Sequence, residues 1–238
     1  MILATGYDAR EFPGHEVFCH SVVKRARKRP TMLRIYSRGG MPDVGTTHFT
    51  MARFAIPAML GSGFKGRAIF CDATDMVCLA DIFELDDLFD PRFAVQVVKH
   101  PDYVSRHKRK FIGTVMEAPN KNYPRKNWAS VMLINCAHPA WEGIDYKFLR
   151  TKADPATMLE LRFIPDDAIG ELPPEWNVLV DEQQPAKGAK ILHWTAGIPV
   201  FHHYRDAPEA IQWFDEMTDW LQHGEKELSM WMPKEPAT

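Results

Sequence analysis

Apolar segments of strand length alternate with helix signals along the first third of the chain, and this alternation is the strongest constraint on its fold. Residues 1–6 and 67–71 are short apolar runs, and residues 32–37 alternate apolar with polar side chains, so we predict three strands. Apolar stripes at helical spacing lie between them, over residues 17–26 and 46–60. Strands that alternate with helices form α/β folds with a largely parallel sheet. The sequence therefore predicts a three-layer α/β/α sandwich around a mostly parallel mixed sheet.

Weaker signals continue the pattern to the end of the chain. We expect a turn at Pro13 and Gly14 before the first helix, a kink at Pro57 in the second, and a helix end at Gly224. The remaining predicted elements are helices at 81–89, 155–163 and 207–222 and strands at 93–98, 131–136 and 190–194. No internal repeat or low-complexity segment interrupts them, so residues 1–238 are interpreted as one domain.

Composition excludes several classes of protein. Lysine and arginine number 29 against 31 acidic residues, so no strong overall field draws the chain onto nucleic acid or an anionic membrane. No run of 18 apolar residues occurs, which argues against a membrane span. The four cysteines show no C-x-x-C spacing and three lie in apolar runs, as expected of a protein from a reducing compartment. We therefore expect a cytoplasmic location.

The acidic segment after the third strand is the strongest chemical signal. The apolar strand that ends at Cys71 is followed by Asp72 and Asp75. Carboxylates at a strand end can bind Mg²⁺ or Mn²⁺ and leave coordination positions for the phosphates of a substrate. Aspartate is also common after strands because its side chain bonds to the next turn of backbone. Spacing alone leaves both interpretations open.

A series of motifs in matching order resembles the GT-A-type glycosyltransferases, especially glycosyltransferase family 8, which includes glycogenin and bacterial lipopolysaccharide sugar transferases. The acidic segment is similar to the metal-binding motif of that family, and the match covers most of the chain. The other matching stretches are residues 2–8 (the first strand and nucleotide loop), Arg53, residues 130–135 (S-V-M-L-I-N), residues 172–177 (L-P-P-E-W-N) and His193 with Gly197 and Pro199.

This resemblance implies a metal-dependent hexosyl- or pentosyltransferase, retaining at the anomeric carbon, with a nucleotide diphosphate sugar as donor, most simply a UDP-sugar. Residues 1–98 would form the nucleotide-sugar half and residues 99–238 the acceptor half with the C-terminal helix. The implied metal ligands are Asp72, Asp75 and His193. The implied donor contacts are Tyr7 and Asp8 to base or ribose and Arg53 to the diphosphate, with Asp72 and Asp75 reaching it through the metal.

One departure from the family pattern concerns Asp72. The family motif is usually D-x-D, whereas this chain has Asp72-x-x-Asp75. Alignment from Asp81 backwards matches Asp75 to the second family aspartate and displaces Asp72 by one position. Side chains three apart on a strand face opposite ways. Asp72 can therefore join Asp75 only if the backbone turns at Ala73 and Thr74.

The other implied site residues have structural alternatives. A histidine at a strand end is more often a hydrogen-bonded structural residue than a ligand. With the resemblance, His193 is expected to bind metal, and an imidazole beside two carboxylates favours Mn²⁺ over Mg²⁺. Asp166 and Asp167 precede the L-P-P-E-W-N turn and are candidates for a catalytic contact with sugar or acceptor. They could equally cap a helix.

Other segments of the sequence allow further interpretations. The basic, aromatic-containing segment 99–126 could hold nucleic-acid phosphate and stack an extruded base, as an enzyme that glycosylates a modified DNA base requires. The irregular acidic motif is also compatible with a non-catalytic nucleotide-sugar-binding module. Residues 61–66 satisfy G-x-G-x-x-G but follow a helix and precede a strand, the reverse of the dinucleotide fingerprint, so they are interpreted as a loop. The Asp72 segment is also similar to a phosphatase nucleophile strand, so phosphoryl chemistry is a minor alternative. The acceptor, whether saccharide, protein or modified DNA, has no readable code, and neither has the oligomeric state.

Overall fold

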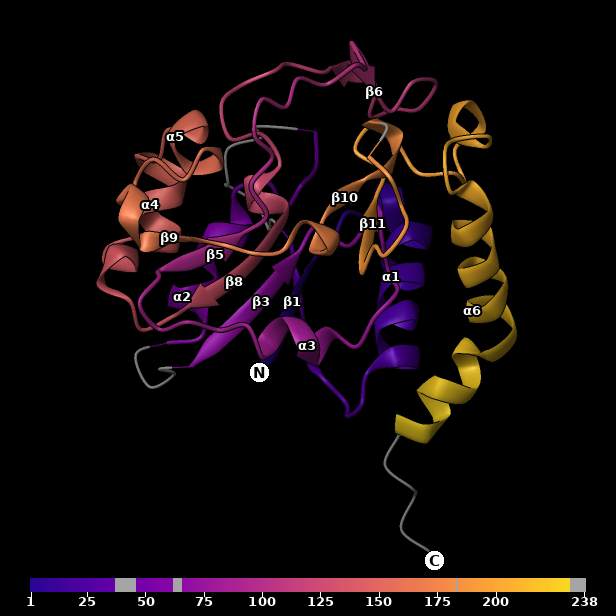
Figure 1. The fold of residues 1–238 in the computed structure, drawn as a ribbon, viewed down its shortest axis with the longest axis horizontal. Helices are drawn as coiled ribbons and strands as arrows, with labels where there is room; N and C mark the ends of the chain where they lie inside the picture. The colour runs from indigo at the N-terminus through magenta and orange to yellow at the C-terminus, as the bar shows by residue number, and fades with distance from the viewer. Residues whose placement is uncertain (37–45, 62–65, 183, 232–238) are drawn as a thin grey trace, which may run out of the picture.

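The computed structural model describes residues 1–36, 46–61, 66–182 and 184–231, with side chains placed up to residue 224. Its centre is a six-stranded sheet of order β2-β1-β3-β8-β5-β9, in which only β8 runs against the other five strands (Figure 1). The strands are β1 (Ile2–Gly6), β2 (Thr31–Ile35), β3 (Arg67–Cys71), β5 (Val95–Val97), β8 (Val131–Asn135) and β9 (Ile169–Glu171). The predicted mostly parallel mixed sheet is confirmed.

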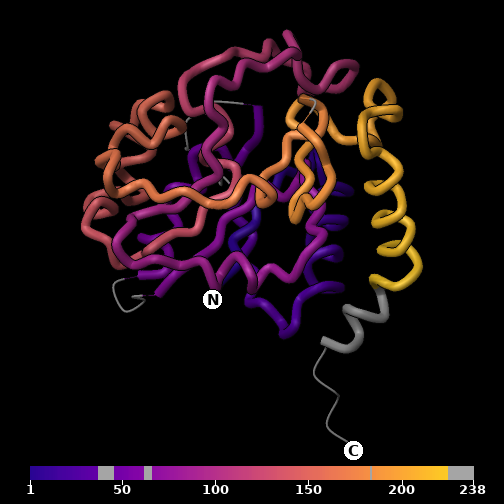
Figure 2. The backbone as a smooth tube through the Cα atoms, viewed as in Figure 1, coloured from indigo at the N-terminus to yellow at the C-terminus, as the bar shows by residue number. Residues whose placement is uncertain are grey.

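Alternating side chains of the sheet build a core on each face. Ala4 and Phe70 point into one core, which the short helices α2 (Ile56–Met59), α4 (Tyr146–Thr151) and α5 (Pro155–Leu159) cover. Leu3 and Ile69 point into the other core, which α1 (Phe12–Arg25) covers. Helix α6 (Ala210–Trp231) packs outside α1, and Figure 2 traces the long C-terminal helix down that side. Two covered faces give the predicted three-layer sandwich.

A second, smaller sheet positions the end of the chain against the acidic segment. Its order is β10-β11-β4, formed by β10 (Val178–Leu179), β11 (Ile191–His193) and β4 (Met76–Cys78). β11 runs antiparallel to β4, with His193 opposite Met76. The remaining elements are helix α3 (Ile82–Asp86) and the hairpin of β6 (Arg109–Lys110) with β7 (Ala118–Pro119). Because β4 follows the acidic turn directly, this sheet brings β11 to the end of β3.

Several sequence expectations about element boundaries are wrong. Pro13 and Gly14 form no turn but lie in the first turn of α1, where a proline lacks only an N–H that has no helical partner. Gly224 does not end the last helix, which continues to Trp231. The predicted helix over residues 46–60 is a 3-10 turn at Ala52–Ala55 followed by α2, with Pro57 in its first turn rather than at a kink.

Two sequence features complete the comparison with the fold. Residues 62–65 of the glycine motif lie outside the described residues. Within the described part of the chain, no helix combines the length and the apolar character that crossing a membrane requires.

Candidate functional site

A tight turn after β3 brings Asp72 and Asp75 to the same side of the backbone. The N–H of Thr74 donates to the carbonyl of Asp72 at 2.7 Å, which closes a γ-turn around Ala73. Ala73 has a φ of 64°, in the left-handed region that costs a residue with a Cβ atom free energy. This turn at Ala73 and Thr74 removes the strand alternation that would separate the two carboxylates. The backbone condition for joining Asp72 to Asp75 is therefore met.

Two glycines allow other elements to approach this turn. A Cβ on Gly14 would lie 1.9 Å from the carbonyl oxygen of Thr74, and one on Gly6 would lie 2.8 Å from that of Asp72. Only glycine permits such contacts. The first turn of α1 and the end of β1 thus support the acidic turn from behind, which helps to maintain its strained backbone.

His193 faces the acidic turn from β11. Its Nε2 lies 3.3 Å from Oδ2 of Asp75, and its Nδ1 lies 2.8 Å from Oδ1 of Asn177. The amide of Asn177 has a defined orientation because its Nδ2 donates to the carbonyl of Asn127 at 3.2 Å. Oδ1 of Asn177 then accepts the proton of Nδ1, so Nε2 of a neutral His193 keeps its lone pair for a ligand.

The three side chains form a candidate metal centre. Asp72, Asp75 and His193 each offer one ligand atom, and these atoms lie within 4.8 Å of one another. Oδ1 of Asp75 is buried with neither a hydrogen bond nor an ion pair among the described residues, whereas Oδ1 of Asp72 has an ion pair with Arg53. An unpartnered buried oxygen is costly, and a cation would satisfy it. Two carboxylates and an imidazole suit Mn²⁺, so the residues fit the metal that the fold family implies.

The electrostatics of the centre also fit a cation. Burial raises the pKa of Asp72, and the neighbouring Asp75 carboxylate adds to the rise, although Arg53 opposes it. Burial would lower the pKa of His193, but the carboxylates of Asp75 and Asp72 outweigh it and raise that pKa. Both shifts mean that the metal-free cluster attracts protons. A divalent cation would replace them.

Arg53 lies beside the acidic turn. Its Nη1 is 2.6 Å from Oδ1 of Asp72 and also donates to the carbonyl of Ala129, while its Nε donates to the carbonyl of Thr50. The guanidinium is buried, and its carbon lies 5.2 Å from the ring centroid of Phe49 and 5.0 Å from that of Phe70. The family resemblance predicts that Arg53 contacts the diphosphate. In the structure it is held by its ion pair with Asp72, and it lines the cavity.

A cavity of about 360 Å³ opens in front of the two aspartates. Asp72 and Asp75 line one part of it, and the segment from β6 to the start of β8 lines another. Four cationic and two acidic side chains contribute to its wall: Arg53, Lys110, Lys121, Lys126, Asp72 and Asp75. A cavity with one acidic and one basic region can hold a cation together with an anionic ligand.

Tyr7 and Asp8 lie at the end of β1, outside the lining of this cavity. The carboxylate of Asp8 accepts four hydrogen bonds, from the backbone N–H groups of Arg10 and His48 and from the Arg10 guanidinium. Tyr7 packs edge-on against His15 beneath the guanidinium of Arg34. Asp8 therefore organises the loop after β1, while the half-buried ring of Tyr7 is the more accessible of the two.

Asp166 and Asp167 are not brought to the metal cluster or the cavity lining. Both are exposed in a 3-10 turn before β9, and the Asp166 side chain is 81% accessible. Its Oδ1 lies 2.7 Å from Nη2 of Arg125. This geometry gives neither residue a catalytic contact with the candidate centre. Their predicted catalytic role has no support from the arrangement of the site.

The sequence missed several residues of the site. Asn177 was noted only as part of a turn, although it orients His193. Glu11 is fully buried, and its carboxylate accepts a hydrogen bond from the hydroxyl of Thr74. Thr74 lies between Asp72 and Asp75 in the sequence. Burial, with the charges of Asp75 and Asp8, raises the pKa of Glu11 well above its usual range. A single glutamate at the start of a helix carries no sequence signal for such a position.

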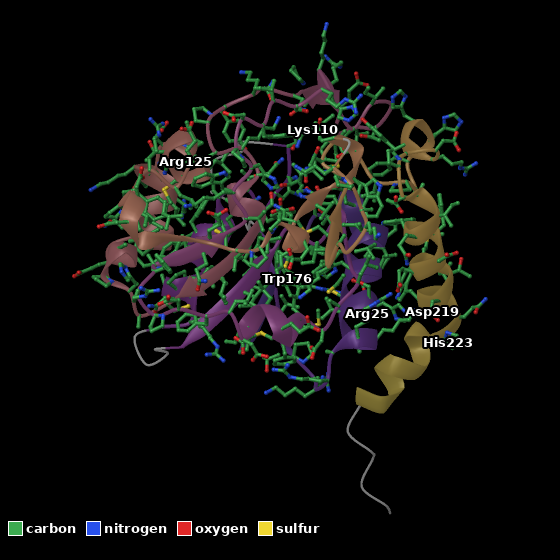
Figure 3. The ribbon with its side chains drawn as sticks, in the orientation of Figure 1. Arg25, Lys110, Arg125, Trp176, Asp219 and His223 are labelled. Carbon is green, nitrogen blue, oxygen red and sulfur yellow. The ribbon has the colours of Figure 1, made fainter. Side chains whose placement is uncertain are left out.

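A second cluster with the same residue types lies between α1 and α6. His20, Glu216 and Asp219 also have potential ligand atoms within 4.8 Å of one another. Here Lys24 lies 2.6 Å from Asp219 and 3.5 Å from Glu216, and Arg25 pairs with Glu216. Figure 3 shows Arg25, Asp219 and His223 grouped where α1 faces α6. Cations of the protein already occupy this cluster.

Comparison with known proteins places the chain among characterised folds. No family model matches the sequence. Protein CDI of Arabidopsis thaliana is 33% identical over 241 residues, covering 93% of this chain and 88% of that protein. The galactosyltransferase LgtC superposes on 92% of this chain and 96% of its own with a TM-score of 0.57 at 14% identity. The bifunctional glycosyltransferase WbbM gives a TM-score of 0.60 at 16% identity, and the chain spans about half (51%) of its length. The fold is thus that of the GT-A glycosyltransferases.

Proposed function

Because the chain belongs to the family of Protein CDI from Arabidopsis thaliana and has the GT-A fold, we propose that it is a metal-dependent glycosyltransferase that uses a nucleotide diphosphate sugar, a UDP-sugar in the simplest case. The observation that carries the proposal is the convergence of Asp72, Asp75 and His193 beside a cavity with a basic wall. Residues 1–98 supply the acidic turn and Arg53, and residues 99–238 supply His193 and the lysines of the basic wall (Lys110, Lys121 and Lys126), so the site needs both proposed halves.

The chemical difficulty of sugar transfer is the departure of the diphosphate. The bond between the anomeric carbon and the β-phosphate oxygen breaks with both electrons on that oxygen, while an acceptor oxygen bonds to the carbon and loses its proton. Positive charge grows on the sugar and negative charge on the leaving diphosphate. A divalent cation held by Asp72, Asp75 and His193 would supply Lewis-acid stabilisation of that negative charge.

The protein's own residues have defined tasks in this proposal. Arg53 holds Asp72 in place and adds a fixed positive charge at the cavity wall. Asn177 keeps Nε2 of His193 directed at the acidic turn. Tyr7 offers a ring to the base or ribose, and Asp8 holds the loop that presents it. Retention at the anomeric carbon is carried over from the family resemblance.

Two alternatives from the sequence are weaker on this geometry. The modified-DNA acceptor depended on a basic segment, yet Arg109 pairs with Glu117, Arg125 pairs with Asp166, and Lys126 is buried. The non-catalytic binding module depended on the irregular acidic motif, and the γ-turn at Ala73 compensates for that irregularity. A saccharide or protein acceptor is the proposal that remains.

Hydrolysis of nucleotide sugars tests the proposal directly. The purified chain is incubated with radiolabelled UDP-sugars and Mn²⁺, with and without saccharide and protein acceptors, and released sugar and UDP are measured. We expect Mn²⁺-dependent release that Asp75→Asn abolishes. Stabilisation by UDP in a thermal-shift assay only when Mn²⁺ is present would support the donor site independently. Absence of turnover with every donor, or turnover unaffected by Asp75→Asn, would contradict the proposal.

A further inference from the structure

The wall of the cavity contains a lysine, Lys110, without a hydrogen bond or ion pair among the described residues. Lys110 is half-buried at the end of β6 and lines the cavity, and no hydrogen bond or ion pair of its ammonium occurs among the described residues. Its neighbour Arg109, in contrast, is paired with Glu117 on the outside of the hairpin. Figure 3 shows Lys110 at the β6 end of the molecule, well away from the α1–α6 cluster.

The backbone next to Lys110 is anchored to the segment that follows β11. Phe111, the next residue, is buried with a φ of 54°, and its N–H donates to the carbonyl of Ala196 at 2.7 Å. Ala196 follows β11 by three residues, so the base of the hairpin is tied to the segment that carries His193. Lys110 therefore lines the cavity from a hairpin base that is anchored to the segment after β11.

Lys126 adds a second cation to the same wall. Its side chain is only 3% exposed, and Nζ donates to Oδ1 of Asn120 at 2.6 Å and to the carbonyl of Lys121 at 3.0 Å. Burial and the charge of Lys110 lower the pKa of Lys126 to about 8. Two cations that repel each other beside a cavity favour an anion between them.

Asn127 provides an independent observation that points to a ligand. The residue is 9% exposed, lines the cavity, and its Nδ2 donor is buried without a hydrogen-bond partner among the described residues. Its own carbonyl accepts from Asn177, which in turn orients His193. An unsatisfied buried donor is costly unless a ligand acceptor completes it.

We propose that Lys110, Lys126 and Asn127 form the anion subsite for the diphosphate of the donor, in the cavity that Asp72 and Asp75 also line. This inference rests on the proposed function. When the anomeric bond breaks, the bond electrons stay on the β-phosphate oxygen and the diphosphate gains one negative charge. Fixed cations then stabilise the leaving group more than the intact donor, which accelerates the step. The lysines are thus assigned to the leaving diphosphate rather than to an acidic acceptor.

The test compares UDP with UMP in the presence of Mn²⁺ by isothermal titration calorimetry. Lys110→Met should weaken UDP binding about tenfold, the usual cost of a charge-assisted hydrogen bond, and should narrow the preference for UDP over UMP. Lys108→Met is the matched control, since Lys108 is exposed and outside the cavity lining, and it should leave both affinities unchanged. Binding of Mn²⁺ alone, measured by electron paramagnetic resonance, should be unaffected by either variant.

Asn127→Gly provides a second variant that is expected to fold. Asn127 has a φ of 65°, which glycine adopts without strain, so the melting temperature should not fall while UDP affinity does. UDP affinity within about twofold of wild type in both Lys110→Met and Asn127→Gly would overturn the subsite. Equal losses of UDP and UMP would overturn its assignment to the leaving phosphate. Wild-type protein that binds no UDP with Mn²⁺ would instead refute the proposed function.

Discussion

Two clusters in this molecule join a histidine to two carboxylates, and they differ in what surrounds them. In the cluster between α1 and α6, Lys24 and Arg25 neutralise Glu216 and Asp219. At the end of β3, Asp72 and Asp75 line a cavity, and Oδ1 of Asp75 is buried with neither a hydrogen bond nor an ion pair among the described residues. Residue types alone therefore do not identify a metal site. The β3 cluster differs in Oδ1 of Asp75, a buried ligand atom that no cation of the protein pairs with among the described residues, whereas the carboxylates of the α1–α6 cluster are paired with Lys24 and Arg25.

The pKa values of Asp72 and Asp219 shift in opposite directions, because the protein supplies more positive charge to Asp219 than to Asp72. Hydrogen bonds from Lys24 and His20 hold the pKa of Asp219 well below its usual range. Burial raises the pKa of Asp72. One carboxylate already has its counter-charge from the protein, whereas the other lacks enough of it. The first cluster is expected to stabilise the fold, and the second to bind a cation.

The largest expected effect is loss of metal binding in Asp75→Asn. An amide removes the charge of a central ligand, so Mn²⁺ affinity should fall by more than about 100-fold, beyond about 2.7 kcal/mol. Asp219→Asn makes the same change in the α1–α6 cluster and should leave Mn²⁺ affinity unaltered. Asp72→Asn should cost less than Asp75→Asn, because Arg53 already pairs with Asp72. Electron paramagnetic resonance of free Mn²⁺ measures all three; similar losses in Asp75→Asn and Asp219→Asn would erase the distinction between the clusters.

The next effect concerns the residue that orients His193. Asn177→Ala removes the acceptor for Nδ1 and should lower Mn²⁺ affinity about 10- to 100-fold while the ligands stay in place. Asn135→Ala is the matched control. Asn135 is the last residue of β8, whereas Asn177 bonds to Asn127, which precedes the first residue of that strand, and Nδ2 of Asn135 donates to the carbonyl of Pro91. The same titration measures both variants. Unchanged affinity in Asn177→Ala would show that His193 needs no support.

A smaller effect is expected on stability from the α1–α6 cluster. Glu216→Ala leaves Arg25 and Lys24 short of a buried partner and should lower the free energy of unfolding by about 1–2 kcal/mol, less than for a fully buried pair because both cations are partly exposed. Urea denaturation measures this change. The Mn²⁺ affinity of the variant should equal that of wild type. If Glu216→Ala also lowered Mn²⁺ affinity, the ion would bind in the α1–α6 cluster rather than at the end of β3, which would contradict the account.

The smallest expected effect is the opposite pH dependence of the two clusters, below about 1 kcal/mol each. Because the pKa of His193 is raised in the folded protein, protonation of His193 stabilises the metal-free protein at pH values below the ordinary pKa of histidine. This contribution disappears as the pH rises through the raised pKa. Because the pKa of Asp219 is lowered in the folded protein, its ionised carboxylate stabilises the protein at pH values above the ordinary pKa of aspartate. That contribution disappears as the pH falls through the lowered pKa. Thermal melts of His193→Gln and Asp219→Asn across pH should show these opposite trends. If the two variants changed the melting temperature with the same pH dependence, the claim that His193 and Asp219 lie in opposite electrostatic environments would be wrong.

The fold could be predicted from sequence where local signals agree with burial. β3 is a continuous apolar run, and it forms at the predicted residues. α1 has a clear apolar stripe before its basic end, which predicts the helix, but the helix begins at Phe12 rather than at residue 17. β4 and β10 were not predicted, because two or three residues carry no periodicity. Gly14 was misplaced in a turn, since only the three-dimensional contact with Thr74 explains a glycine inside a helix.

The candidate site was predictable only in part. Asp72, Asp75 and His193 were chosen from their residue types, their positions at strand ends and the family resemblance, and the fold brings them together. Lys126 lies in a basic run that resembles a solvated surface, and nothing local reveals that it is buried. Asn177 and His193 are separated by a loop, so their hydrogen bond depends on the pairing of β10 with β11. Such relationships arise from packing rather than from local sequence.

A crystal of the chain grown with Mn²⁺ and UDP, measured at a wavelength where manganese scatters anomalously, decides between the two clusters. The account predicts one strong anomalous peak within coordination distance of Asp75, Asp72 and Nε2 of His193. A peak beside Glu216 and Asp219 instead, or no peak at the end of β3, would contradict it.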